Sequence, residues 1–178
     1  GGVVRRSEPA ARDVFKKVAG YHTLRLALAQ KAILVEGDSD ELVVQRAYMD
    51  AHGGRLPIQV GIDVISVGTA FLRFLELARA LKIPVAVVTD NDGDTAAVEK
   101  KYAAYKGEAF VNICFDPVVD SGSLTVKGKA FNYNTLEPKI LKANSLATLN
   151  SVLGASAKTD DELRIHPRPN KTESAVYT

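Results

Sequence analysis

A short apolar run that ends in three closely spaced carboxylates constrains this chain more than any other feature. Residues 83–88 are rich in Val and are typical of a short buried strand, and Asp90, Asp92 and Asp94 follow at alternate positions. Carboxylates crowded at the end of a buried strand repel one another unless a cation or a basic group lies among them. The stretch therefore predicts a divalent-metal site at the carboxyl end of a central strand.

The composition of the 178 residues is that of an ordinary globular domain, with 46% hydrophobic and 25% charged residues. The formal net charge of +2 does not by itself indicate nucleic acid. The single cysteine, Cys114, excludes an internal disulfide and fits a reducing compartment, so a cytoplasmic location is expected. No apolar run reaches the ~18 residues that indicate a membrane span. The chain begins with Gly1 rather than Met, so we treat it as a piece of a longer protein.

Helical and strand-like patterns alternate along the first two thirds of the chain. The expected strands are residues 31–35, 62–67, 83–88 and 109–115, and the expected helices are residues 8–29, 40–52, 69–81 and 95–105. This alternation is typical of an α/β fold with a central, mostly parallel sheet and helices on both faces. In such sheets, ligands bind beyond the carboxyl ends of the strands.

The pattern changes after residue 116. Short strands or an ordered loop are expected over residues 117–133, and a helix over 134–144. A polar segment follows, and a further helix start is expected at residue 170. We therefore expect three parts, which are an N-terminal helix or linker from a missing upstream region (1–29), an α/β core (30–145) and a small helical addition (146–178).

A second acidic turn follows another expected strand. Glu36 and Asp40 come after residues 31–35, and the two acidic turns converge if their strands are neighbours. Carboxylates of this kind suit magnesium, manganese or calcium. Neither zinc pattern is available, because the chain has one cysteine and three histidines far apart. Taken singly, each acid has a structural alternative as a helix cap or a turn residue. Two acidic clusters at two strand ends are hard to explain by capping alone.

Several known acid-rich patterns do not fit. A calcium EF-hand loop starting at Asp90 would need Gly and Glu where the chain has Thr95 and Lys101. A haloacid-dehalogenase-type phosphatase would have Thr in place of Asp94, and no GxxxxGK[ST] loop for ATP is present.

The two strand ends together resemble the Toprim domain. The motifs are Val35-Glu36-Gly37-Asp38-Ser39-Asp40 and Asp90-Asn91-Asp92. Toprim is the catalytic module shared by topoisomerases, bacterial primases and the OLD (overcoming lysogenization defect) nucleases. Two later motifs resemble the OLD family in particular, namely Thr135-Leu136-Glu137-Pro138 and Asn170-Lys171-Thr172-Glu173. The similarity spans roughly residues 30–175.

This resemblance implies a Toprim-like, Rossmann-type fold for the core and metal-dependent endonuclease cleavage of DNA. Two Mg²⁺ or Mn²⁺ ions about 4 Å apart would support the reaction, and Ca²⁺ is expected to bind without supporting it. The implied metal ligands are Glu36, Asp40, Asp90, Asp92 and Glu137, with Asp94 contributing through a water. The resemblance also implies that Lys171 acts at the scissile phosphate. The expected catalytic residues are Glu36, Asp90 and Lys171. The expected contacts to the DNA backbone are Lys127, Lys129, Lys139 and Lys142.

The resemblance also implies partners and leaves rivals open. An OLD protein carries an N-terminal ABC-type ATPase, which this piece lacks, and a homodimer of the full-length protein is a further expectation. One rival is another Toprim enzyme of topoisomerase or primase type. The other is a non-catalytic Toprim module that binds DNA or protein. The complete set of acids together with Lys171 argues against a pure binding module.

Overall fold

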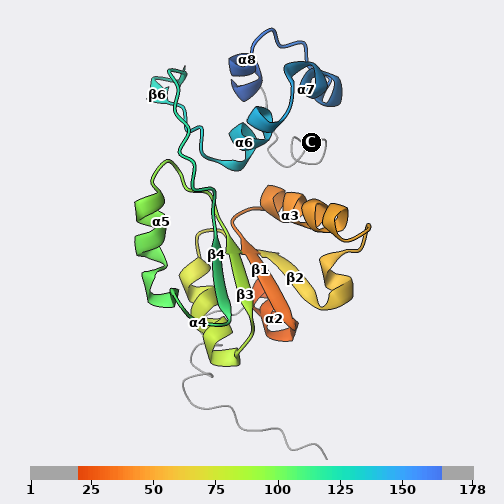
Figure 1. Cartoon of the computed structure of the whole chain (residues 1–178), viewed down its shortest axis with the longest axis vertical. Helices are drawn as coiled ribbons and strands as arrows, with labels where there is room; N and C mark the ends of the chain where they lie inside the picture. Colours follow the sequence, from red (N-terminus) through yellow and green to blue (C-terminus); the bar gives the residue numbers. More distant parts are fainter. Residues whose placement is uncertain (1–19, 166–178) are drawn as a thin grey trace, which may run out of the picture.

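The computed structural model describes residues 20–165, and its centre is a four-stranded parallel sheet in the order β2-β1-β3-β4 (Figure 1). The strands are β1 (Lys31–Val35), β2 (Ile62–Ser66), β3 (Val85–Val88) and β4 (Val111–Cys114). All three neighbouring pairs are parallel, as the buried strand patterns predicted. Apolar, Val-rich runs favour strands because β-branched side chains pack well on a pleated surface.

The order of the strands determines which helices cover which face. The chain moves from β1 outward to β2, and then returns past β1 to β3. Because the crossovers between parallel strands are right-handed, this reversal places α3 (Asp38–Ala51) on one face and α4 (Phe71–Leu81) and α5 (Thr95–Lys101) on the other. The carboxyl ends of β1 and β3 thus form the switch point at which open α/β sheets bind ligands.

The main hydrophobic core lies on the face covered by α4. There α2 (Tyr21–Leu28), α4, α5 and the 3₁₀ turn Ala103–Tyr105 pack against the sheet in one cluster. Leu26, Leu34, Leu75 and Val87 are completely buried in it. Burying a side chain of this size stabilises the fold by about 1.5–3 kcal/mol.

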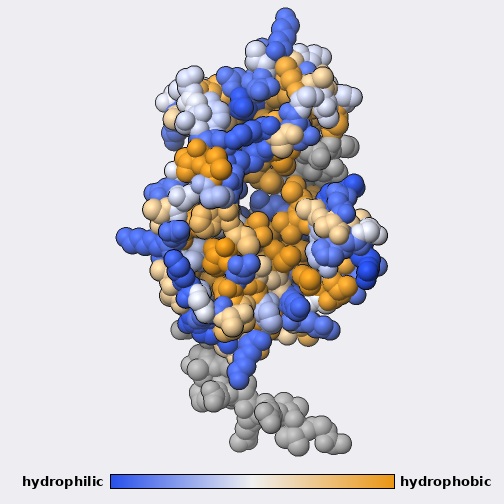
Figure 2. All heavy atoms as spheres, in the orientation of Figure 1, coloured by the Kyte–Doolittle hydropathy of each residue, from blue (hydrophilic) through white to orange (hydrophobic). Residues whose placement is uncertain are grey.

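The opposite face is covered less completely. There α3 contacts β1 and β2, and the 3₁₀ turn Pro57–Val60 lies between α3 and β2. Ile33 and Ala86 on the central strands remain half-buried and line a shallow hollow of about 370 Å³. Figure 2 shows apolar residues gathered in the middle of this view, between the helices α5 and α3 of Figure 1.

A smaller helical unit lies beyond the carboxyl ends of the strands (Figure 1). A short antiparallel ribbon of β5 (Thr125–Val126) and β6 (Lys129–Ala130) leads to α6 (Leu136–Ala143), α7 (Leu146–Leu153) and α8 (Asp160–Ile165). Leu141, Leu149 and Leu163 from the three helices form a second small core.

The elements agree with the sequence pattern through β4 except at a few ends, whereas neither α7 nor α8 was individually expected. The helix expected over residues 95–105 is split into α5 and a 3₁₀ turn, with Tyr102 between them packed edge-on against Phe71. The polar segment includes the helix α8, which the pattern did not indicate because Leu163 is its one buried residue. The helix expected over residues 8–29 is described only from residue 20, and Lys171 lies outside the described residues.

Candidate active site

The pairing of β1 with β3 places two acidic turns side by side. Leu34 lies opposite Val87, so by the same register Glu36 stands level with Thr89, directly before Asp90. The sequence pattern predicts that the two acidic turns converge if their strands are neighbours. Because β1 and β3 are neighbours, the turns do converge.

Asp90 lies at the centre of the acids. The pKa of its carboxyl is raised to about 7, first by burial and then by nearby negative charge. In decreasing order of effect, that charge comes from Asp40, Asp92, Glu36 and Glu137. The structure thus brings four of the other five acids predicted for a metal site within electrostatic reach of Asp90.

A tight turn after β1 holds Asp40 over the strand end. The backbone N–H of Gly37 donates to Asp40 Oδ2 at 2.9 Å, which forms part of the N-terminal cap of α3. A Cβ atom on Gly37 would lie 3.2 Å from the same oxygen, so a larger residue would crowd Asp40. The glycine therefore permits the close approach of the carboxylate to the turn.

Asn91 fixes the second acidic turn. Its side chain is 2% exposed and donates to the carbonyl oxygens of Asp116 and Val118, at 2.6 and 3.0 Å. Its Oδ1 atom accepts from the N–H of Gly93 at 2.8 Å. Sequence reasoning treated Asn91 only as a spacer between two acids, because its partners lie far along the chain.

The two flanking aspartates have different surroundings. Asp92 adopts a left-handed backbone conformation (φ 49°), is exposed, and accepts from Asn132 Nδ2 at 2.9 Å. Asp94 is the N-cap of α5 and accepts from the N–H of Ala97 at 2.9 Å. Asp94 is also absent from the groups that shift the pKa of Asp90. The structure therefore gives Asp94 a capping role.

Glu137 reaches the site from the helical unit. It lies in the first turn of α6, where Thr135 is the N-cap residue and its Oγ1 lies 3.5 Å from Glu137 Oε2. Asn134, three residues before Glu137, is therefore not the N-cap of α6. The Asn134 side chain instead pairs with the backbone of Asp120, through hydrogen bonds of 2.7 and 2.9 Å.

A comparison with known protein families finds a match that includes residues of both acidic turns. Residues 28–92 match the family described as "Overcoming lysogenization defect protein-like, TOPRIM domain". This stretch is therefore similar to an OLD-like Toprim domain. This confirms the resemblance drawn from the two strand-end motifs, and the parallel α/β sheet agrees with a Toprim fold. The match ends at Asp92 and so does not extend to β4, Glu137 or Lys171. No curated protein and no solved structure matches the chain.

Two of the lysines expected to contact DNA are engaged in ion pairs beside the Toprim core. Lys139 Nζ lies 2.8 Å from Asp116 Oδ2 and 2.7 Å from Asp120 Oδ2, and Lys142 Nζ lies 2.6 Å from Asp120 Oδ1. These pairs compete with any phosphate contact. Lys127 and Lys129, at the β5–β6 ribbon, are exposed and form no ion pair within the described part of the chain.

Tyr102 is a polar group beside the Toprim acids that sequence reasoning missed. The residue is 3% exposed, and no described residue meets its hydroxyl in normal hydrogen-bond geometry. The pKa of Tyr102 is raised to about 12, mainly because the residue is buried; the nearby Thr89 side chain acts to lower this pKa, and the Glu36 carboxylate acts to raise it. The phenol therefore lies close to both strand ends that carry the acids.

The chemistry of the donors fits a hard divalent cation, because the groups around Asp90 are all carboxylates. Across residues 20–165, no three His, Cys, Asp or Glu side chains are arranged to hold a metal ion. The carboxylates are close enough to raise the pKa of Asp90 without converging on a single point.

Within residues 20–165, no helix has the length and apolar character needed to cross a membrane.

Proposed function

We propose that this chain is the catalytic region of a metal-dependent DNA endonuclease of the OLD type. The observation that carries the proposal is the parallel pairing of β1 with β3, which brings Glu36 and Asp90 to one edge of the sheet. The Toprim match over these same strands supports it, since Toprim domains act on nucleic acids.

The charge of the site explains why a cation is needed. A phosphodiester is anionic, so the acids around Asp90 would repel it. Two Mg²⁺ or Mn²⁺ ions bound there would supply the positive charge and Lewis acidity that phosphodiester hydrolysis requires. Ca²⁺ is expected to occupy the same carboxylates without supporting cleavage.

The proposed metal ligands come from three parts of the fold. Glu36 and Asp40 come from the end of β1 and the start of α3. Asp90 and Asp92 come from the turn after β3, and Glu137 closes the set from α6. Because the pKa of Asp90 is raised to about 7, this carboxyl group gives up its proton when a cation binds near neutral pH.

Lys171 completes the proposal, although it lies outside the described residues. Its ammonium group is assigned to the scissile phosphate, where it stabilises developing charge or protonates the leaving oxygen. The Lys171→Ala variant is expected to keep its affinity for Mn²⁺ and to lose turnover. Loss of Mn²⁺ binding would instead make Lys171 a structural residue.

Nicking of supercoiled plasmid tests the function. The protein is expected to nick plasmid with Mg²⁺ or Mn²⁺, and chelation should stop the reaction. Asp90→Ala and Glu36→Ala should each lower the rate by at least about 100-fold. Asp50→Ala is the matched control, because Asp50 is an exposed acid at the far end of α3 that pairs with Arg46. Normal nicking by Asp90→Ala would refute the assignment, and primer synthesis without nicking would favour a primase.

A further inference from the structure

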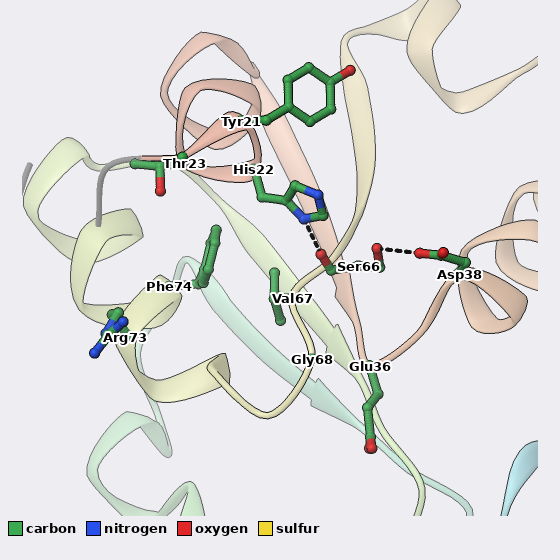
Figure 3. A pocket seen from close by; sticks show the side chains of 11 residues that line it. Tyr21, His22, Thr23, Glu36, Asp38, Ser66, Val67, Gly68, Arg73 and Phe74 are labelled. Atoms are coloured by element: carbon green, nitrogen blue, oxygen red, sulfur yellow. Dashed lines mark hydrogen bonds between the residues drawn. The ribbon is translucent and has the colours of Figure 1, made fainter. Parts of the chain in front are cut away.

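An open pocket of about 500 Å³ lies beside the acidic edge, between α2, the end of β2 and the start of α4. Its lining includes Tyr21 and His22 from α2, Glu36 and Asp38 after β1, and Arg73 and Phe74 from α4. Figure 3 shows His22 and Asp38 pointing toward Ser66 from opposite sides. Glu36 belongs both to this pocket and to the acids around Asp90, so the two sites share a wall.

The pocket presents an aromatic ring to solvent. Tyr21 is 72% exposed, while the other aromatic residue of the lining, Phe74, is buried in the core. The Tyr21 ring meets His22 edge-on, with the ring centres 5.7 Å apart. An exposed ring at the edge of a pocket offers a surface on which a planar base can stack.

The pocket also contains a cation that is available to an anion. Arg73 has no carboxylate partner among the described residues. By contrast, Arg46, Arg79 and Arg164 each pair with one carboxylate, and Arg25 pairs with two. An arginine in this position binds phosphate oxygens well, because its planar fork donates several hydrogen bonds.

His22 presents a second polar atom to the pocket. Its Nδ1 atom donates to the backbone carbonyl oxygen of Ser66, so the orientation of the ring is fixed. The Nε2 atom is left as the nitrogen that can meet a ligand.

We propose that this pocket binds one unpaired nucleotide of the DNA strand, next to the phosphate held at the acidic edge. Its base stacks on Tyr21, and Arg73 and His22 contact its phosphate. The carboxylate of Asp38 offers an acceptor for base N–H groups. This inference rests on the proposed function, since Glu36 links the pocket to the reacting phosphate.

Stacking on Tyr21 requires that the nucleotide be unpaired. A base within a duplex is covered on both faces by its neighbours and along one edge by its partner, so it cannot lie against Tyr21. Stacking on an aromatic ring tolerates every base, so the pocket selects for DNA structure rather than for sequence. The preferred substrates are therefore DNAs with single-stranded character at the cut, such as flaps, gaps and overhangs.

Binding in Ca²⁺ tests the pocket without requiring cleavage. Fluorescence anisotropy is measured with a short labelled single strand and with a fully paired duplex of the same sequence. Tyr21→Ala and Arg73→Ala should weaken single-strand binding by at least about fivefold and change duplex binding by less than about twofold. Tyr21→Phe keeps the ring and should bind like the native chain.

Arg55→Ala is the matched control, since Arg55 is an exposed arginine outside the pocket that also has no carboxylate partner among residues 20–165. The salt dependence separates the two roles. Arg73→Ala should reduce the slope of log affinity against log salt by about 0.7 for a single strand, and Tyr21→Ala should leave the slope unchanged.

The outcomes separate this inference from the proposed function. Equal losses on single strand and duplex, no loss in Tyr21→Ala, or absence of single-strand binding by the native chain would overturn the pocket assignment. Equally tight binding of free dTMP would also overturn it, because the site would then be one for mononucleotides. Selective loss in Tyr21→Ala, with no plasmid nicking by the native chain, would support the pocket while refuting the nuclease.

Discussion

The hydroxyl of Ser66 donates a hydrogen bond to Asp38 Oδ1 at 2.9 Å. The N–H of Ser66 donates to Glu41 Oε2 at 3.2 Å, and its carbonyl oxygen accepts from His22. Ser66 is 7% exposed, so the end of β2 holds the first turn of α3 through a buried residue whose polar groups are all bonded. Asp38 and Glu41 are thus anchors, while Asp40, between them in sequence, contributes to the acids around Asp90.

Ser66→Ala tests whether this anchor positions the metal ligands. The variant leaves Asp38 without its hydroxyl donor, so the free energy of unfolding should fall by about 1–2 kcal/mol in urea denaturation. If the anchor also orients Asp40, the affinity for Mn²⁺, measured by calorimetric titration, should fall severalfold. Ser66→Thr keeps the hydroxyl and should restore Mn²⁺ affinity. Lower stability with unchanged Mn²⁺ affinity would limit Ser66 to a role in the fold.

The raised pKa of Asp90 predicts how stability depends on pH in the absence of metal. Below about pH 4 the carboxyl is protonated in both the folded and the unfolded chain. Between pH 4 and 7 the folded chain retains this proton and the unfolded chain loses it, because the folded pKa is about 7. The stabilising contribution of the protonated group is therefore lost as the pH rises from about 4 through 7, with a slope of at most about 1.4 kcal/mol per pH unit, and the curve levels off above the folded pKa.

Asp90→Asn removes this dependence. In urea denaturation with a chelator present, the variant should lose less stability than the native chain between about pH 5 and pH 8. It should also be the more stable of the two at the upper end of this range. Adding Mg²⁺ at about pH 8 should raise the stability of the native chain more than that of the variant, because the ion binds the folded carboxylates. Equal pH slopes in the two proteins would show that Asp90 ionises freely in the folded chain.

Much of the fold could be predicted because its signals are local. The strands β1 to β4 are short apolar runs bounded by polar turns, and α4 carries a strongly amphipathic pattern. The sequence did not predict that β1 and β3 are neighbours, because strand order depends on contacts between segments that are distant in the chain. The helix α8 was missed because one leucine among charged residues gives no periodic pattern.

The acids of the site could be predicted from sequence, but not the groups that hold them in place. Glu36, Asp40, Asp90 and Asp92 follow two strands, so the topology brings them together. The hydrogen bonds of Ser66 to Asp38 and of Asn91 to Asp116 link positions more than twenty residues apart. The same is true of the pair formed by Lys139 with Asp116, which a sequence cannot distinguish from an exposed lysine.

Asp92 and Asp94 provide a comparison between a metal ligand and a helix cap two residues apart. Asp94→Ala removes the acceptor of the Ala97 N–H, so the free energy of unfolding should fall by about 1 kcal/mol. The affinity for Mn²⁺ should change little, because Asp94 is not among the acids that act on Asp90. Asp92→Ala should have the opposite effects, with a loss of Mn²⁺ affinity and little change in stability, since the Asp92 side chain is exposed.

Asp94→Asn distinguishes the two roles more sharply, because asparagine caps helices about as well as aspartate but lacks the negative charge. The variant should recover the stability lost in Asp94→Ala and keep the Mn²⁺ affinity of the native chain. Asp92→Asn retains a polar partner for Asn132 but should remain weak in Mn²⁺ binding, since the neutral amide is a poorer ligand than a carboxylate. A marked loss of Mn²⁺ affinity in Asp94→Asn would place Asp94 at the metal after all, acting through a water as the sequence pattern suggested.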